Sequence, residues 1–130
     1  MAEEYLRQGA GIKHDETKPP LFYNPPEIQR GMARAFGHGA KKYDRWNWMG
    51  GLAVSRLLAA CLRHLLSWFW EETLDPQSGL SHLDHAAANL AMLMETVKRS
   101  PNLDDRPPHQ SDGLGVAGVD CLDGAREPES

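Results

Sequence analysis

Apolar residues recur along this chain at intervals of three and four positions, and no stretch shows the alternation that is typical of β-strands. The pattern predicts an all-α fold with three main helices. The first helix begins at Asn24, which is followed by two prolines and Glu27, a sequence typical of a helix start. Its apolar pattern fades at Gly37 and Gly39, so we expect the helix to end there and a loop to follow.

The other two helices are predicted to form an antiparallel pair, because only a short connection joins them. The second covers about residues 54–72 and the third about 82–99, with Ser81 and Asp84 in a capping-box pattern at its start. Residues 54–72 are apolar around most of the helix, so we expect them to be the central helix of a small bundle. Oligomerisation, as a homodimer or homotetramer, would cover the remaining apolar surface.

Composition divides the 130 residues into three parts. Residues 1–23 lack periodicity and contain glycines and prolines, which predicts an extended arm laid on the surface. Residues 24–99 form the helical domain. Residues 100–130 carry seven acids against two arginines, a net charge of −5 that leaves +1 for residues 1–99. This tail lacks aromatics and is predicted to be disordered. The domain is not basic enough to indicate a nucleic-acid partner.

The chain has the features of a cytoplasmic protein. Its first 18 residues lack the apolar core of a signal peptide, and its two cysteines have no metal-binding or disulfide-framework spacing. The longest apolar stretch, residues 52–70, contains Arg56, Arg63 and His64, which would be costly inside a bilayer. We therefore expect no membrane partner.

Candidate metal ligands concentrate around the connection between the second and third helices. They are His64, Glu72, Asp75, His82 and His85, with Asn89 one turn further on. Helical spacing places them on facing sides of the antiparallel pair, where they can converge, and a mixed oxygen and imidazole cluster suits a divalent ion such as Mg²⁺ or Mn²⁺. Glu72 and Asp75 follow the negative end of a helix and so favour a cation. The alternative is that the histidines are structural.

Basic residues gather before and within the second helix. They are Lys41, Lys42, Arg45, Arg56 and Arg63. A triphosphate needs such partners, and a charge that interrupts an apolar helix requires an acid or a ligand. Ion pairs with Asp84 or Glu95 are the alternative for the two arginines within the helix.

Two tryptophans and an amide follow the lysines. Trp46, Asn47 and Trp48 suit stacking on a nucleobase and hydrogen bonding to its edge. The alternative is that the tryptophans fill the core.

Together these residues resemble the phage dATP/dGTP diphosphohydrolases, which are similar to the MazG-type all-α nucleotide pyrophosphatases. The resemblance covers about residues 13–97, and its most specific part runs from Arg63 to Asn89. The residues that carry it are Lys13–Pro19, Pro25–Glu27, Phe36–Tyr43, Asn47–Trp48, Arg63–His64, Trp68, Glu72, Asp75, Ser78–Gly79 and His82–Asn89.

The resemblance implies Mg²⁺- or Mn²⁺-dependent hydrolysis of dGTP or dATP to the monophosphate and pyrophosphate. Some members serve phages that replace adenine with 2-aminoadenine, which places such a protein in the host cytoplasm. The implied metal ligands are Glu72, Asp75 and His82 or His85, and the implied catalytic residues are His64, Glu72, Lys41, Lys42 and Arg63. The implied substrate contacts are Asn47 and Trp48 at the base, Asp15 and Lys18 of the arm closing over it, and Arg56 and Asn89.

Two other classes of protein remain open. One is an HD-like metal-dependent phosphohydrolase that releases phosphate, with His64, His82, His85 and either Asp75 or Asp84 as ligands. The other is a non-enzymatic helical interaction module, in which the histidines are structural. The identity of the product separates the two enzymes, and stability that is independent of metal would favour the interaction module.

Overall fold

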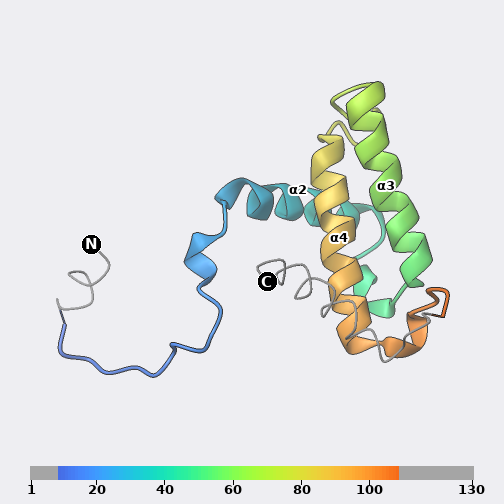
Figure 1. Ribbon diagram of the computed structural model, residues 1–130. Helices are drawn as coiled ribbons and strands as arrows, with labels where there is room; N and C mark the ends of the chain where they lie inside the picture. The colour runs from blue at the N-terminus through green and yellow to red at the C-terminus, as the bar shows by residue number, and fades with distance from the viewer. Residues whose placement is uncertain (1–8, 109–130) are drawn as a thin grey trace, which may run out of the picture.

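The structure is a computed structural model that describes residues 9–108 (Figure 1). Three α-helices form its body: α2 covers Pro26–Lys42, α3 covers Val54–Trp70 and α4 covers His82–Arg99. Three short 3-10 helices are η1 at Leu21–Tyr23, η2 at Asn47–Gly50 and η3 at Pro101–Leu103. No strand occurs within residues 9–108, so the predicted all-α fold with three main helices is confirmed.

The predicted start of α4 agrees with the structure, whereas the predicted end of α2 does not. Ser81 caps α4 by accepting a hydrogen bond from the Leu83 backbone N–H at 3.0 Å. Asp84 does not complete the predicted capping box, because its carboxylate accepts hydrogen bonds from Arg34 of α2. Helix α2 continues through Gly37 and Gly39 to Lys42. A glycine inside a helix costs only about 1 kcal/mol, and the lysines of the last turn favour the negative helix end.

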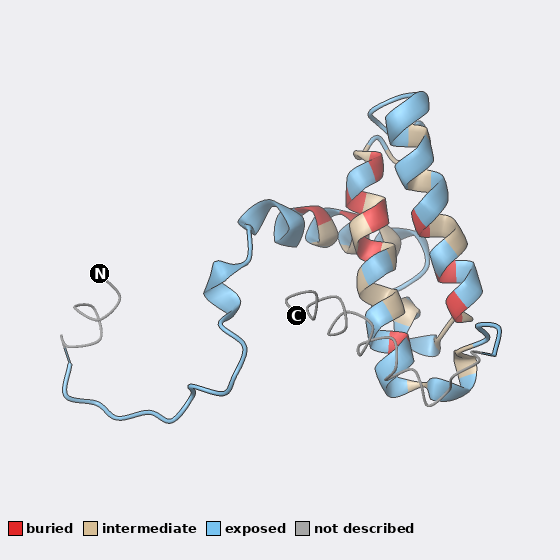
Figure 2. Cartoon of the chain, viewed as in Figure 1, coloured by how far each residue is buried: buried red, intermediate tan, exposed pale blue. Residues whose placement is uncertain are grey.

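Helix α4 is the centre of the bundle. It packs against both α2 and α3; in Figure 1, α3 runs alongside α4, whereas α2 crosses it at a steep angle. Buried residues are most frequent along α4, whereas much of α3 is exposed (Figure 2). The prediction that residues 54–72 form the central helix is therefore wrong, because the main neighbour of α3 is α4, and within residues 9–108 no other helix packs on α3 to a similar extent. Among the described residues no helix is long and apolar enough to cross a membrane.

Residues 9–23 form an arm that leaves the helical body (Figure 1), and every one of them is exposed. Its backbone bonds are local, such as the one from the Lys18 N–H to the Asp15 carbonyl at 3.0 Å. Prolines on both sides of η1 fix an extended backbone that carries the arm away from α2. Within a single chain residues 9–23 therefore extend away from the helical body, and the arm laid on a surface stays a prediction.

The packed part of the chain continues past residue 99. Helix η3 packs against α4. Asp105 accepts hydrogen bonds from the backbone N–H and the hydroxyl of Ser55, and so satisfies a donor in the first turn of α3. Residues 101–105 thus contact the helical body, while the domain boundary predicted at residue 99 stays a prediction. The prediction of disorder for residues 109–130 lies outside the described residues.

Candidate functional site

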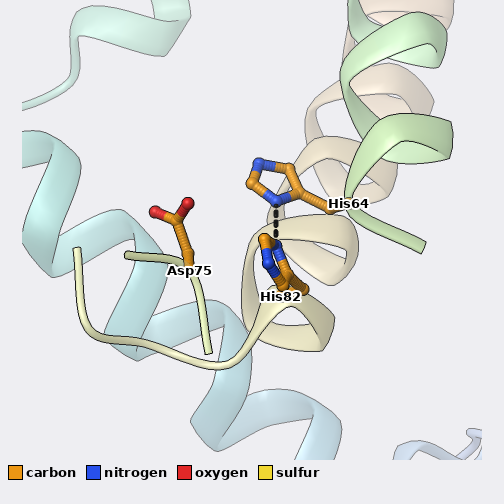
Figure 3. A group of neighbouring side chains, drawn as sticks. All are labelled: His64, Asp75 and His82. Atoms are coloured by element: carbon orange, nitrogen blue, oxygen red, sulfur yellow. Dashed lines mark hydrogen bonds between the residues drawn. The ribbon is translucent and has the colours of Figure 1, made fainter. Parts of the chain in front are cut away.

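Three side chains from three parts of the chain meet at one end of the α3 and α4 pair (Figure 3). His64 comes from α3, Asp75 from the connection and His82 from α4. Each offers one atom that can bind a metal ion, and these atoms lie within 4.8 Å of one another. Nδ1 of His64 lies 2.9 Å from Nδ1 of His82, and His82 is only 4% exposed. We call this group the His–Asp cluster.

The connection between α3 and α4 is folded tightly, and this fixes Asp75. The Asp75 backbone N–H donates to the Leu80 carbonyl at 2.7 Å, and the Gly79 N–H donates to the Asp75 carbonyl at 2.7 Å. Gly79 has a φ of +76°, a conformation that glycine adopts readily. Leu74 and Ser81 also pair across the base of the turn. The connection therefore holds Asp75 facing the histidines.

A second group of side chains surrounds the His–Asp cluster. Nε2 of His82 lies 3.1 Å from Oε2 of Glu72. Nε2 of His85 lies 2.7 Å from the Ser78 hydroxyl, and that hydroxyl donates to Oδ2 of Asp75 at 2.9 Å. The ring of His85 also stacks on His64, with centroids 4.7 Å apart. Each member of the cluster is thus oriented by at least one neighbour.

The environment favours neutral imidazoles beside an ionised carboxylate. Burial, together with the nearby histidines, lowers the pKa of His64, and burial likewise lowers the pKa of His85. Burial alone would raise the pKa of Asp75, but hydrogen bonds from the Ser78 hydroxyl and backbone outweigh it, and the Asp75 pKa is lowered. Near neutral pH these groups are in the protonation states in which they bind divalent cations.

A pocket of about 590 Å³ opens beside the cluster. Its walls come from the end of α2, the loop that follows it, the connection and the inner sides of α3 and α4. His64, Asp75 and His85 line the pocket, so the cluster forms part of its wall. The volume is within the range of sites for small molecules and cofactors.

The loop after α2 has a strained backbone where it borders the pocket. Asp44 and Trp46 have positive φ angles of 142° and 64°, which are uncommon for residues with side chains. Trp46 lines the pocket and is 63% exposed. Trp48 packs against Phe36 with ring centroids 5.9 Å apart. Trp46 therefore presents a free ring surface to the pocket, while Trp48 serves in part to hold the loop on α2.

The structure brings together most, but not all, of the residues singled out from the sequence. The proposed metal ligands Glu72, Asp75, His82 and His85 converge with His64. The pocket wall includes Lys42, Asn47, Trp48 and Asn89. Glu72 and His82 of the converging group are not part of the wall. Also outside it are Lys41, Arg56 and Arg63, which are exposed, and Asp15 and Lys18 on the arm.

The alternative for Arg56 and Arg63, ion pairs with Asp84 or Glu95, is not borne out within the described residues. Asp84 pairs with Arg34, and Glu95 lies 3.9 Å from Arg99. Both arginines lie on the exposed part of α3, so neither charge needs a buried partner.

Sequence reasoning assigned no role to three contributors to this region, although His38 and Ser78 lie in segments that carry the family resemblance. His38 lies in the pocket wall with its ring 6.1 Å from that of His85. Ser78 links His85 to Asp75, and the Asp-x-x-Ser spacing is a signal for such a turn. Arg34 donates from Nε and Nη2 to the two carboxylate oxygens of buried Asp84, at 2.8 and 3.1 Å. No local pattern indicates that last pair.

The fold and the site define an all-α domain with an imidazole and carboxylate cluster in the wall of a ligand-sized pocket. The family described as dATP/dGTP diphosphohydrolase, N-terminal, matches residues 8–106, and the chain belongs to this family. A dATP/dGTP diphosphohydrolase of Salmonella phage PMBT28 is 38% identical over 96 residues, which are 74% of this chain and 33% of that protein. The chain thus matches about a third of the length of this relative. No solved structure gives a significant match.

Proposed function

We propose that this domain hydrolyses purine deoxynucleoside triphosphates, dGTP or dATP, to the monophosphate and pyrophosphate with the help of a divalent metal ion. The observation that carries the proposal is that His64 and Asp75 of the His–Asp cluster line the same pocket as the loop after α2, which contains Trp46 and Trp48. Membership of the family and the name of the phage relative indicate the nucleotide class. The setting that we propose is phage nucleotide-pool remodelling, including supply for 2-aminoadenine DNA, in the host cytoplasm.

In the proposed reaction a water oxygen attacks the α-phosphorus, and the bond from that phosphorus to the α,β-bridging oxygen breaks. Pyrophosphate leaves with the bridging oxygen, and the proton of the water passes to solvent or to a nearby base. A metal ion at the His–Asp cluster would polarise the phosphate and lower the pKa of a water bound to it. The nucleotide enters as its Mg²⁺ or Mn²⁺ complex, since such ions bind through phosphate oxygens.

The residues of the chain divide between the phosphates and the base. Lys42 lines the pocket and can neutralise charge on the pyrophosphate, with Lys41 and Arg63 adding positive charge from outside the wall. Asn47 and the exposed ring of Trp46 suit hydrogen bonding to and stacking on the base. The other pocket and surface residues assigned to substrate are Trp48, Asn89 and Arg56.

We also propose that the domain acts as a homodimer or a homotetramer. One side of α3 exposes large apolar residues: Leu58, Leu62, Leu65, Leu66, Phe69 and Trp70, between 39% and 73% exposed. Such a stripe suits a self-complementary contact, in which the same surface of each copy meets the other. The arm lies within the matched family region yet leaves its own helical body, so Asp15 and Lys18 are proposed to reach the pocket of a partner copy.

The test of the activity is product analysis with each purine deoxynucleotide in water enriched in ¹⁸O. We expect monophosphate and pyrophosphate in equal amounts, with the label in the monophosphate, as attack at the α-phosphorus requires. Release of inorganic phosphate would instead support the HD-like phosphohydrolase. No turnover with either nucleotide, by protein that is folded and loaded with metal, would contradict both enzymatic readings.

The test of the assembly is sedimentation of the purified chain. Leu62→Glu places a charge on the apolar stripe and is expected to convert the oligomer to monomer, whereas Gln29→Glu, at an exposed position of α2, is the matched control. A wild-type chain that sediments as a monomer would contradict the assembly.

A further inference from the structure

We infer that the resident ion of the His–Asp cluster is an imidazole-binding transition-metal ion of the Zn²⁺ and Co²⁺ class, in preference to Mg²⁺, and that Glu72 orients His82 for this ion without ligating it. The inference deepens the proposed function and rests on it for the role of the ion. It replaces the acid-rich ligand set suggested by the sequence with one that contains two imidazoles.

The donor atoms set the class of ion. The cluster offers two imidazole nitrogens and one carboxylate oxygen, and His82 is almost completely buried. Mg²⁺ prefers oxygen ligands and retains several waters, whereas imidazole suits the later first-row ions. Two histidines and one carboxylate also form the protein ligands of several catalytic zinc sites, in which further positions stay open to water or substrate.

The contact between Glu72 and His82 fixes which nitrogen of His82 faces the cluster. Oε2 of Glu72 lies 3.1 Å from Nε2 of His82, which favours a proton on Nε2. Nδ1 of His82 then carries a lone pair, and this is the atom that lies 2.9 Å from Nδ1 of His64. A carboxylate behind a histidine is the usual arrangement that orients a metal-binding imidazole. Glu72 is therefore a positioning residue.

The neighbours of Asp75 and His85 complete the assignment. Ser78 donates both its backbone N–H and its hydroxyl to Oδ2 of Asp75, at 3.1 and 2.9 Å. Oδ1 receives no hydrogen bond from the described residues and is available to a cation. Nε2 of His85 is engaged by Ser78, and its ring stacks on His64. We therefore assign three protein ligands, with His85 as a support for His64.

The experiment uses the full chain, stripped of metal with a chelator and titrated with Co²⁺, Zn²⁺ or Mg²⁺ in the absence of nucleotide. We expect one Co²⁺ per chain with visible d–d absorption, displaced by Zn²⁺ and left unchanged by a hundredfold excess of Mg²⁺. Long-range ¹H–¹⁵N spectra should show Zn²⁺-induced shifts of the imidazole nitrogens of His64 and His82. The His85 ring should keep the nitrogen shifts of an unligated imidazole.

Variants test the two roles separately. His64→Ala should abolish the Co²⁺ absorption, while Glu72→Gln should retain the absorption band and weaken binding about 10- to 100-fold. Glu71→Gln, which alters the adjacent exposed acid, is the matched control and should bind Co²⁺ as the wild type does. Loss of the Co²⁺ band in Glu72→Gln that stays folded would make Glu72 a ligand and overturn its positioning role.

The outcomes also separate this inference from the proposed function. Displacement of Co²⁺ by Mg²⁺ at similar concentrations, or no imidazole shift with Zn²⁺, would overturn the inference. If pyrophosphate were nevertheless released with Mg²⁺, the proposed function would stand without it. Tight Co²⁺ binding in a chain that turns over no nucleotide would uphold the metal assignment and contradict the enzymatic proposal.

Discussion

The His–Asp cluster and the N-terminal arm both carry residues assigned to the same reaction, and they are built in opposite ways. Hydrogen bonds and stacking within one chain orient the cluster side chains. The arm is exposed throughout residues 9–23 and carries Asp15 and Lys18 away from the pocket. One chain therefore suffices to preset the cluster, whereas the arm can take part only through something outside its own helical body.

The largest expected effect comes from breaking the cluster. His64→Ala removes one assigned metal ligand and should lower kcat/KM for dGTP by about 10³-fold or more. Because His64 is only half-buried, the melting temperature of the His64→Ala variant, measured with chelator present, should differ from that of the wild type by only a few degrees. Steady-state kinetics and calorimetry check this pair of outcomes. A large loss of stability with activity retained in the folded fraction would make His64 structural.

The next effect tests how the cluster end of α4 is anchored to α2. Arg34→Met leaves the buried Asp84 carboxylate without its two-point partner and should lower the melting temperature by roughly 5 to 10 °C. Arg30→Met is the control, because within residues 9–108 the ion pair of Arg30 is with exposed Glu27 at 3.3 Å, and surface pairs contribute little. Equal melting temperatures for the two variants would argue against the anchor.

A smaller effect is expected in the arm. Replacing Asp15 and Lys18 together by alanine should raise KM for dGTP about tenfold, with kcat and melting temperature close to wild type. A mixed oligomer provides the sharper measurement. Subunits with an intact arm but His64→Ala should return the KM of subunits with the altered arm toward the wild-type value if the arm acts across copies. A KM that stays raised in a verified mixed oligomer would contradict that route.

The smallest effect is a pH dependence of stability in the metal-free protein. The pKa values of His64 and His85 are lowered by burial, so the unfolded chain takes up protons on these histidines before the folded chain does. Stability is therefore full above about pH 6.5 and declines as the pH falls below it. Melting temperatures between pH 7.5 and 5.5 should show this decline. His85→Gln should make it shallower, and an unchanged slope would contradict the assignment.

The parts of the fold that depend on neighbouring residues were predictable from the sequence. Ser81 marked the start of α4, and the i, i+3 spacing of His82 and His85 placed both on one side of a helix. The end of α2 was misplaced, because glycine weakens a helix without necessarily ending it. The position of Asp75 near these histidines was also predictable, because the short connection that contains it forces α3 and α4 to be neighbours.

The parts that depend on how distant segments cross were not predictable. Arg34 and Asp84 are 50 residues apart, and only the packing of α2 on α4 brings them together. Trp46 has a left-handed backbone conformation with a φ of 64°, and the preferences of a tryptophan do not predict it. What covers the apolar side of α3, which we propose to be a second copy, is likewise outside any local pattern. The sequence shows only that this side is apolar.

Gly31 of α2 contributes to the packing of α2 on α4 because it has no side chain. A Cβ at this position would lie 2.7 Å from Oδ1 of Asp84, so even alanine would push the carboxylate away from Arg34. The consequence concerns mutational tolerance: in a library of all single substitutions selected for function, Gly31 should be depleted of variants as sharply as His64. The positions that do not tolerate substitution would then include a residue of α2 that has no side chain, in addition to the residues with chemical roles.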